Sequence, residues 1–445
     1  LFTLLLLPIC LLSYGQVTFT NAPQNKQLVA RDLITNLGTV NISGTVNNSG
    51  VNYDAIEVVV IRGGLFEDSR VSVNLSFSGN IAPFDIDVTI NSELTNYTIT
   101  VNGLTGANTT QIMQANEVVA GDVFIVQGQS NAEANERNGS ASANNSNFIR
   151  VYASGTENGT NLQNNDNWYV AQGDGNKESN GNAGQWGLKV ARMLLNDLNI
   201  PIAIFNGAHG GQPIEFFQAP GDYTTSTGSN YGRMYYRLNK TGLKDNVRAI
   251  LWSQGEANSF GAGLATQSYI NLFNNLKAAW LNDYSNIEHF YLFQTRDCDC
   301  GTTAPGRLKI KEAQRQLAQN DPDITIMPTT GMTLHNDNCH FPFVDGYEKF
   351  ATRIYPLVKR HIYGETIAST FDAPMITSAK LMSPTSLEIE TDSPLQITTT
   401  NLGVLQQDYL LTNVGSATIT AVQISGNKII FTLSAYPGFG RSSSL

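Results

Sequence analysis

The stretch GDVFIVQGQSN, residues 121–131, places a serine directly behind a buried strand. The run from Asp122 to Val126 is short and almost entirely apolar, which is typical of a strand that is covered on both faces of a sheet. Gly128 ends this run, and Ser130 lies in the polar turn that follows. The stretch therefore predicts a buried strand with a polar cluster at its carboxyl end.

Strands and helices alternate in the sequence that follows this stretch. We expect strands within residues 201–211, 247–258, 289–295 and 324–329, and helices within residues 184–198, 269–281, 308–319 and 344–360. Such an alternation predicts an α/β fold with a parallel sheet that is covered by helices on both faces. Ligands bind outside the carboxyl ends of the strands in sheets of this kind, so a site is expected at that edge.

The chain is long enough for several domains. Its 445 residues suggest about three domains at roughly 150 residues each. Alternating β patterns with Gly and Asn turns fill residues 17–118 and return after about residue 367. We expect an N-terminal β-sandwich-like domain at residues 17–118, an α/β domain at 119–366 and a C-terminal β-sandwich-like domain at 367–445. The final RSSSL suggests that the third domain is truncated.

The N-terminus has the composition of an export signal, which we expect to span residues 1–15. Residues 1–12, LFTLLLLPICLL, are apolar and uncharged, and Ser-Tyr-Gly at 13–15 supplies the small residues of a cleavage site. The basic residues expected before such a run are missing, so we expect the true start of the chain to lie upstream. A buried strand or short helix is the alternative, and Pro8 disfavours a lipid anchor on Cys10. The signal predicts a protein that is secreted, periplasmic or at the cell surface.

Composition and charge disfavour two classes of partner. The formal net charge is −10 and the pI is about 5.0, whereas a nucleic-acid-binding protein needs a basic stripe. Beyond the N-terminus no window approaches the roughly 18 consecutive apolar residues of a membrane span. We therefore expect neither a nucleic-acid partner nor a membrane-spanning segment.

Polar, Gly-rich clusters follow four of the expected strands. They are GQSN at residues 128–131, HGGQP at 209–213, WSQGEAN at 252–258 and DNCH at 337–340. A structural turn needs Gly or Asn, but it has no need for Ser, Gln, Asp and His together. Because the carboxyl ends of parallel strands meet at one edge, we expect the four clusters to converge there.

A base for Ser130 can be found by elimination among the five histidines. Two of them open a strand at its amino end or close a helix, which leaves His209, His335 and His340 at the carboxyl edge. Of these, only His340 has an acid three residues before it, at Asp337. That spacing lets a carboxylate accept a hydrogen bond from Nδ1 and leaves the other ring nitrogen to take the serine proton.

The four clusters, in this order, resemble the SGNH hydrolase superfamily and, more closely, the sialate O-acetylesterase-like carbohydrate acetylesterases. The resemblance covers residues 121–363 and implies a flavodoxin-like, three-layer α/β/α domain. It implies that Ser130 is the nucleophile, that His340 is the general base and later the acid, and that Asp337 orients the histidine. It implies no metal and no organic cofactor.

The same resemblance implies an oxyanion hole. Its donors would be the backbone N–H groups of Ser130 and Gly211 and the side-chain amide of Gln254. Gly210 could serve in place of Gly211, and Asn258 competes with Gln254. We prefer Gln254, because residues 252–256, WSQGE, resemble the W-x-Q-G-E form of this group of esterases.

The implied reaction is removal of an acetyl group from a glycan by way of an acetyl-serine. The substrate would be an acetylated carbohydrate, either a sialate or a plant or algal polysaccharide. A protein of another class is the alternative: a glycan-binding or adhesion protein on an inactive hydrolase fold. A lipase or thioesterase is less suited, because the Asn-rich stretch at residues 131–182 offers no apolar channel for an acyl chain.

Some of these residues also have a structural interpretation. Ser130 could cap a helix, and the same role at Asp337 is compatible with catalysis. We expect Trp252 to belong to the core and Glu256 to belong to a hydrogen-bond network.

Three cysteines remain after the expected signal. A disulfide from Cys298 or Cys300 to Cys339 would pin the segment that carries His340, and export would favour such a bridge. The alternative is a metal site that also uses His335 and His340, but it would consume the expected base.

Overall fold

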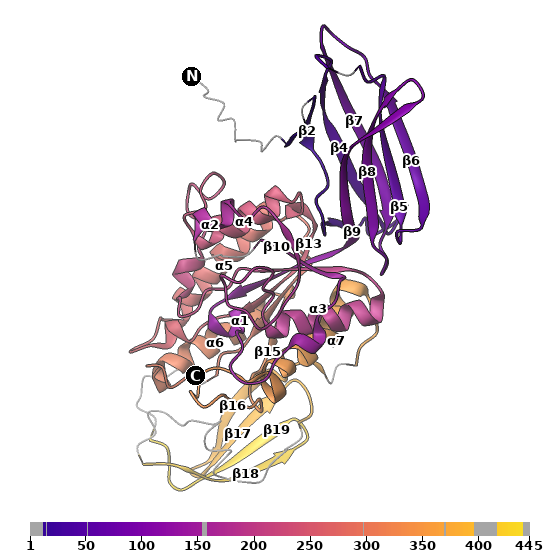
Figure 1. Cartoon of the computed structure of the whole chain (residues 1–445). Helices are drawn as coiled ribbons and strands as arrows, with labels where there is room; N and C mark the ends of the chain where they lie inside the picture. The colour runs from indigo at the N-terminus through magenta and orange to yellow at the C-terminus, as the bar shows by residue number, and fades with distance from the viewer. Residues whose placement is uncertain are drawn as a thin grey trace.

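The computed structural model describes residues 12–14, 16–50, 52–153, 158–296, 298–368, 371–395 and 416–438. It has a mixed α/β fold, in which strands dominate both ends of the chain and helices accompany the strands of the central part (Figure 1). The expected export signal lies almost wholly outside the described residues. None of the helices in these ranges has the length and apolarity needed to cross a lipid bilayer.

Within the described residues, eight strands precede β9 in the N-terminal part. They are β1 (Leu12–Tyr14), β2 (Val17–Asn21), β3 (Leu28–Ala30), β4 (Leu37–Asn47), β5 (Ala55–Arg62), β6 (Phe66–Asn74), β7 (Ile81–Asn91) and β8 (Tyr97–Thr105). One sheet has the order β1-β2-β4-β7, while β5 pairs with β6 and β8. Exposed and buried residues alternate along the whole of β7, as expected for a strand with one face on a core. Strands of both sets share one hydrophobic core.

Strand β9 (Asn108–Gly128) connects these strands with the central sheet. Its first part pairs antiparallel with β8, and its second part pairs parallel with β12 (Ile202–Asn206) and β13 (Val247–Ser253). The boundary expected between residues 118 and 119 lies inside this single strand of 21 residues. Gly121 permits the path, because a Cβ atom there would lie 1.8 Å from the carbonyl oxygen of Pro201.

The central sheet contains the parallel strands that the sequence pattern predicts. Its other members are β10 (Ile149–Tyr152), β11 (Trp168–Val170), β14 (His289–Phe293) and β15 (Ile324–Met327). The order is β11-β10-β12-β9-β13-β14-β15, and along this path the edge strand β11 alone pairs antiparallel. From β9 the chain first builds the β10 side and then the β13 side. The carboxyl end of β9 is therefore the point at which ligands bind in such sheets.

Helices cover both faces of this sheet (Figure 1). They are α1 (Ser130–Glu133), α2 (Gly159–Gln163), α3 (Gln185–Leu198), α4 (Asn230–Lys240), α5 (Thr266–Asp283), α6 (Ala304–Asn320) and α7 (Glu348–Tyr363). Phe124 and Val126 of β9 share a core with α3 and α7. Val123 and Ile125 share the other core with α4, α5 and α6. Successive strand residues face opposite sides, so the two cores lie on opposite faces.

The C-terminal part is a small antiparallel sheet. Its strands are β16 (Ile376–Ser383), β17 (Ser386–Thr391), β18 (Ile419–Ser425) and β19 (Lys428–Leu433), in the order β16-β17-β19-β18. The side chains of Ile419, Ile429, Phe431 and Leu433 form its core. An ion pair between Arg360 of α7 and Asp372 lies at the junction with the central part.

Candidate active site

Ser130 is the first residue of α1 and lies directly behind the end of β9. The turn between them is tight: the backbone N–H of Gln129 donates to the carbonyl oxygen of Ser253 at 2.9 Å. Gly128 adopts φ +131° there, and a Cβ atom on it would lie 2.1 Å from the same oxygen. Residues 121–129 are buried, whereas Ser130 is half-buried. The close approach of two strands thus places the hydroxyl at the edge of the sheet.

A chain of hydrogen bonds joins Ser130, His340 and Asp337. His340 Nε2 lies 2.9 Å from Ser130 Oγ, and His340 Nδ1 lies 2.7 Å from Asp337 Oδ2. Asp337 Oδ1 also accepts the backbone N–H groups of Cys339 at 3.1 Å and of His340 at 3.0 Å. With Nδ1–H donating to the carboxylate, Nε2 is free to accept the serine proton.

The environment sets the charges of this chain. Burial would raise the pKa of Asp337, but the hydrogen bonds from the backbone and side chain of His340 and from the backbone of Cys339 hold it well below its usual range. Burial lowers the pKa of His340 below its ordinary value of 6.5, and the hydrogen bond to Asp337 opposes this only in part. At neutral pH the pair is therefore a carboxylate beside a neutral imidazole, which is the form that a general base requires.

The other two histidines of this edge play different parts. His335 Nδ1 lies 3.3 Å from Asp337 Oδ2, on the same carboxylate oxygen that His340 uses. The ring of His209 packs against that of Phe216, with 4.8 Å between centroids. Of the histidines among the described residues, only His340 hydrogen-bonds to the hydroxyl of Ser130.

The Gly-rich turn after β12 lies against Ser130. A Cβ atom on Gly210 would be 3.5 Å from the Cβ atom of Ser130. The Gly210 N–H donates to the buried carboxylate of Glu133 at 3.0 Å, whereas the N–H groups of Ser130 and Gly211 have no acceptor among the residues that the structure describes. Gly211 is exposed and has φ +75°, a conformation that favours glycine. Of the two glycines, only Gly211 thus keeps its N–H available.

Gln254, the expected third donor, is engaged elsewhere. It is 0% exposed, and its Nε2 donates to Asn258 Oδ1 at 2.7 Å while its Oε1 accepts from Tyr269 Oη at 2.9 Å. The competing amide of Asn258 donates to Glu215 Oε2 at 2.9 Å. The structure therefore joins Gln254 and Asn258 to each other, and neither amide hydrogen-bonds to Ser130.

The amides on either side of Ser130 have a role that the sequence pattern does not reveal. Gln129 is buried, and its Oε1 accepts the backbone N–H groups of Gly255 at 3.2 Å and Ala257 at 3.1 Å. This side chain ties the turn after β9 to the turn after β13. Two amides flanking one serine are the signal that could have indicated this role.

Asn131 makes the corresponding link to the segment that carries His340. Its Nδ2 donates to Glu256 Oε1 at 2.9 Å and to the carbonyl oxygen of Cys339 at 3.2 Å, and its Oδ1 accepts from Tyr347 Oη at 3.0 Å. Burial raises the pKa of Glu256, which belongs to this network as expected. Trp252 is fully buried in the core, also as expected.

The three cysteine sulfurs lie together beside this segment. Cys298 Sγ is 2.01 Å from Cys339 Sγ and 2.09 Å from Cys300 Sγ, and one sulfur atom can form only one of these two bridges. Among the described residues, these three cysteines are the one group of His, Cys, Asp or Glu side chains that lie close enough together to hold a metal ion. His340 faces Ser130 and Asp337 instead, so the larger metal site that included the histidines is not assembled.

The chain is similar to solved structures, one of which agrees with this architecture over most of the chain. The crystal structure of a carbohydrate acetylesterase from Xanthomonas citri is 18% identical, covers 93% of this chain and 90% of that chain, and has a TM-score of 0.61. A protein from Arabidopsis thaliana is 18% identical and covers 54% of this chain and 99% of that chain, with a TM-score of 0.42. No curated protein sequence matches.

One family matches the region that carries the site. The model of the family described as carbohydrate esterase, sialic acid-specific acetylesterase, matches residues 120–353, which is more than half of the chain. That region includes the strand ends, the turn with Ser130 and the segment with His340. The protein therefore belongs to this family of carbohydrate esterases and is a carboxylic-ester hydrolase.

Proposed function

We propose that the protein is an exported serine esterase that removes acetyl groups from glycans, with Ser130, His340 and Asp337 as its catalytic residues. The observation that carries this proposal is the continuous hydrogen-bond chain from Ser130 Oγ through His340 to Asp337. A glycan-binding protein without catalytic activity would gain nothing from this arrangement.

The first half of the reaction forms an acetyl-enzyme. Ser130 Oγ attacks the carbonyl carbon of the acetyl ester while its proton passes to His340 Nε2. Asp337 holds the imidazole in the tautomer that can accept this proton and stabilises the imidazolium that forms. The proton then passes from His340 to the sugar oxygen, which leaves as the alcohol.

The second half returns the enzyme to its starting state. His340 takes a proton from water, the resulting nucleophile attacks the acetyl-serine, and acetate leaves as Ser130 regains its proton. In both halves negative charge develops on the carbonyl oxygen. We assign the backbone N–H groups of Ser130 and Gly211 to this oxygen, since both lack another acceptor among the described residues.

Gln254 is proposed as a third donor on condition that its amide exchanges partners. In the structure its Nε2 donates to Asn258 Oδ1. The same Nε2 lies 3.3 Å from Gln129 Oε1 and from the carbonyl oxygen of Gln212, and its second N–H would have to leave these acceptors to reach the oxyanion. The two backbone donors need no such change.

The finer organisation of the chain follows from the same proposal. We assign a flavodoxin-like three-layer α/β/α esterase domain to residues 119–366, between β-sandwich-like domains at 17–118 and 367–445. Residues 1–15 are proposed as a signal peptide that leads to secretion, the periplasm or the cell surface. The similar structure from Xanthomonas citri is described as a carbohydrate acetylesterase, and the family description names sialic acid. The proposed substrate is accordingly an acetylated sialate or polysaccharide.

Release of acetate tests the proposal. Wild type is expected to release acetate from 4-nitrophenyl acetate and from either acetylated xylan or acetylated sialic acid, and Ser130→Ala should be at least about 1,000-fold slower. The control is Ser268→Ala, which removes an exposed hydroxyl on α5. Failure of wild type on every acetyl ester, or full activity of Ser130→Ala, would overturn the assignment.

A further inference from the structure

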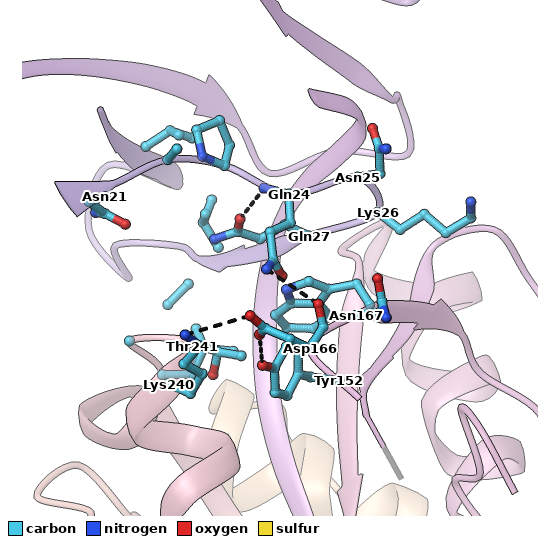
Figure 2. Close-up of a pocket in the computed structure, with 18 of the residues that line it drawn as sticks. Asn21, Gln24, Asn25, Lys26, Gln27, Tyr152, Asp166, Asn167, Lys240 and Thr241 are labelled. Atoms are coloured by element: carbon cyan, nitrogen blue, oxygen red, sulfur yellow. Dashed lines mark hydrogen bonds and ion pairs between the residues drawn. The ribbon is translucent and has the colours of Figure 1, made fainter. Parts of the chain in front are cut away.

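A large cleft separates the N-terminal strands from the β11 edge of the central sheet. Its volume is about 1700 Å³, which exceeds the roughly 300–1,000 Å³ of a small-molecule site. One wall is the segment between β2 and β3, and the other is built by β10, β11 and the end of α4 (Figure 2). None of Ser130, Asp337 and His340 lines it. The cleft is therefore separate from the site described above and large enough for a chain-like ligand.

The two walls are held at a fixed separation. Arg150 of β10 is fully buried, and its guanidinium donates to the carbonyl oxygens of Lys26 at 2.9 Å and Glu117 at 3.3 Å. Arg31 of the N-terminal part pairs with the buried Asp122 of β9 at 2.9 Å. These charged hydrogen bonds connect the parts of the fold on either side of the cleft. The cleft is thus preformed, which lowers the cost of ordering when a ligand binds.

The lining is enriched in amide side chains. Twelve of the thirty-five lining residues are Asn or Gln, compared with 68 of 445 in the whole chain. An amide offers both a donor and an acceptor, as a sugar hydroxyl does. Asn167 at the start of β11 and Asn239 near the end of α4 are exposed, and their amides have no partner among the described residues. These two groups are available to a ligand from one wall.

The charges of the cleft are compensated within the protein. Lys240 pairs with Asp166 at 3.6 Å, and Asp166 also accepts a hydrogen bond from Tyr152 (Figure 2). Lys26 pairs with Glu117 at 3.2 Å. With its cations already paired, the lining offers little attraction to a polyanion. A neutral ligand that is rich in hydroxyl groups suits it better.

Of the four aromatic residues that line the cleft, Tyr169 is the one that is not buried, and its ring adds an apolar surface to the lining. Tyr169 of β11 is half-buried, and its hydroxyl donates to Asn165 Oδ1 at 2.7 Å. The hydrogen bond fixes the ring while part of it remains accessible. An aromatic ring of this kind can pack against the C–H face of a pyranose, whereas the neighbouring amides bind its hydroxyls.

We propose that this cleft binds a segment of a neutral polysaccharide at a distance from the esterase centre. The site would hold the protein on its polymer while the reactive centre acts elsewhere on the same polymer. Binding here does not require hydrolysis, so the inference goes beyond the proposed function and can be tested without it.

Affinity electrophoresis in native gels tests the inference. The probes are soluble arabinoxylan, xyloglucan and galactomannan, each after chemical deacetylation, and polygalacturonate as the anionic comparison. The proteins are wild type, Ser130→Ala, the double variant Asn167→Ala/Asn239→Ala, and Asn320→Ala as a matched control. Asn320 is exposed at the end of α6, as Asn239 is near the end of α4. Thermal unfolding of each variant verifies that it is folded.

The inference predicts that at least one neutral polysaccharide slows wild type, Ser130→Ala and Asn320→Ala equally. The double variant should bind that polysaccharide roughly tenfold more weakly, since it loses two hydrogen-bonding groups. Absence of retardation by all three neutral probes, retardation by polygalacturonate alone, or equal retardation of the folded double variant would each overturn it. Because the Ser130→Ala protein binds deacetylated polymer in this design, failure of the esterase assignment would leave these outcomes unchanged.

Discussion

The Nε2 atom of His340 lies 2.9 Å from Ser130 Oγ, although 210 residues separate the two in sequence. Ser130 follows β9, and His340 lies in the segment between β15 and α7. Both strands run in the same direction in one sheet, so their carboxyl ends share an edge. The contact between His340 and Ser130 also requires that the segment around His340 is held in place. Asp337 and Asn131 hydrogen-bond to its backbone, and a cysteine bridge holds it at Cys339.

Replacement of Asp337 by Asn should reduce kcat by about 100-fold or more. Oδ1 of Asp337 already accepts two backbone N–H groups, so the single oxygen of Asn would stay there and its NH₂ would face His340 Nδ1. The imidazole would then carry its proton on Nε2 and could not accept the serine proton. Steady-state hydrolysis of 4-nitrophenyl acetate measures the loss. The exposed Asp345→Asn serves as the control, and equal activity of both variants would contradict the role of Asp337.

The pH dependence of kcat/KM should respond to Arg137. Burial is the main cause that lowers the pKa of His340, and the cation of Arg137 lowers it further. Activity requires neutral His340, so kcat/KM should fall as pH falls through a pKa below 6.5. Arg137→Gln removes the cation, raises this pKa and moves the acid limb to higher pH. Arg137→Lys keeps the charge and should leave the limb in place; a limb that moves equally in both variants would show that charge is not the cause.

Asn131→Ala should lower the free energy of unfolding by about 3 kcal/mol. The substitution leaves Glu256, Tyr347 and the carbonyl oxygen of Cys339 without their shared partner in a buried place. Tyr347→Phe removes only one of the three hydrogen bonds and should cost about 1 kcal/mol. Urea denaturation measures both values. A loss no larger for Asn131→Ala than for Tyr347→Phe would mean that Asn131 does not link the segments.

Peptide mapping without reduction should recover Cys298 linked to Cys339. These two residues are buried at 1% and 6% exposure, whereas Cys300 is exposed and should be the thiol that an alkylating reagent labels. Cys339→Ser should then lower stability by about 4 kcal/mol, since this bridge spans 41 residues. Cys300→Ser should have little effect. Recovery of a Cys298–Cys300 peptide with labelled Cys339 would reverse the assignment.

The sequence predicts β9, β12, β13, β14 and β15 because each is a compact apolar run, and all but β14 are followed by one of the four polar clusters. The parallel strand β10 lies inside the Asn-rich stretch at residues 131–182 and escapes this pattern. The contact of Ser130, Asp337 and His340 follows from the same rule, since strand ends meet at one edge. The state of Gln254 could not be predicted in this way. Its hydrogen bonds to Asn258 and Tyr269 depend on packing between elements that are distant in sequence, and no local pattern records them.

Helix α4 and the continuity of β9 also escaped prediction, for related reasons. Six of the eleven residues of helix α4, NYGRMYYRLNK, are Asn, Tyr or Gly, which are weak helix formers. The helix is stabilised by the Ser229 side chain, which accepts the Gly232 N–H at 2.9 Å, and by burial of Tyr231 and Met234. The continuity of β9 depends on pairing with β3 and β8, which are non-local partners. The strand therefore continues through residues 118 and 119, where the sequence pattern predicts a domain boundary.

The most direct measurement of the central claim is covalent labelling of the active serine by a fluorophosphonate, followed by peptide mass mapping. The account predicts a single adduct, on Ser130, with acetate release lost in proportion to labelling. His340→Ala should label far more slowly, because no base then accepts the serine proton. An enzyme that keeps full activity after complete labelling of Ser130, or that loses activity with the adduct on another residue, would contradict the account.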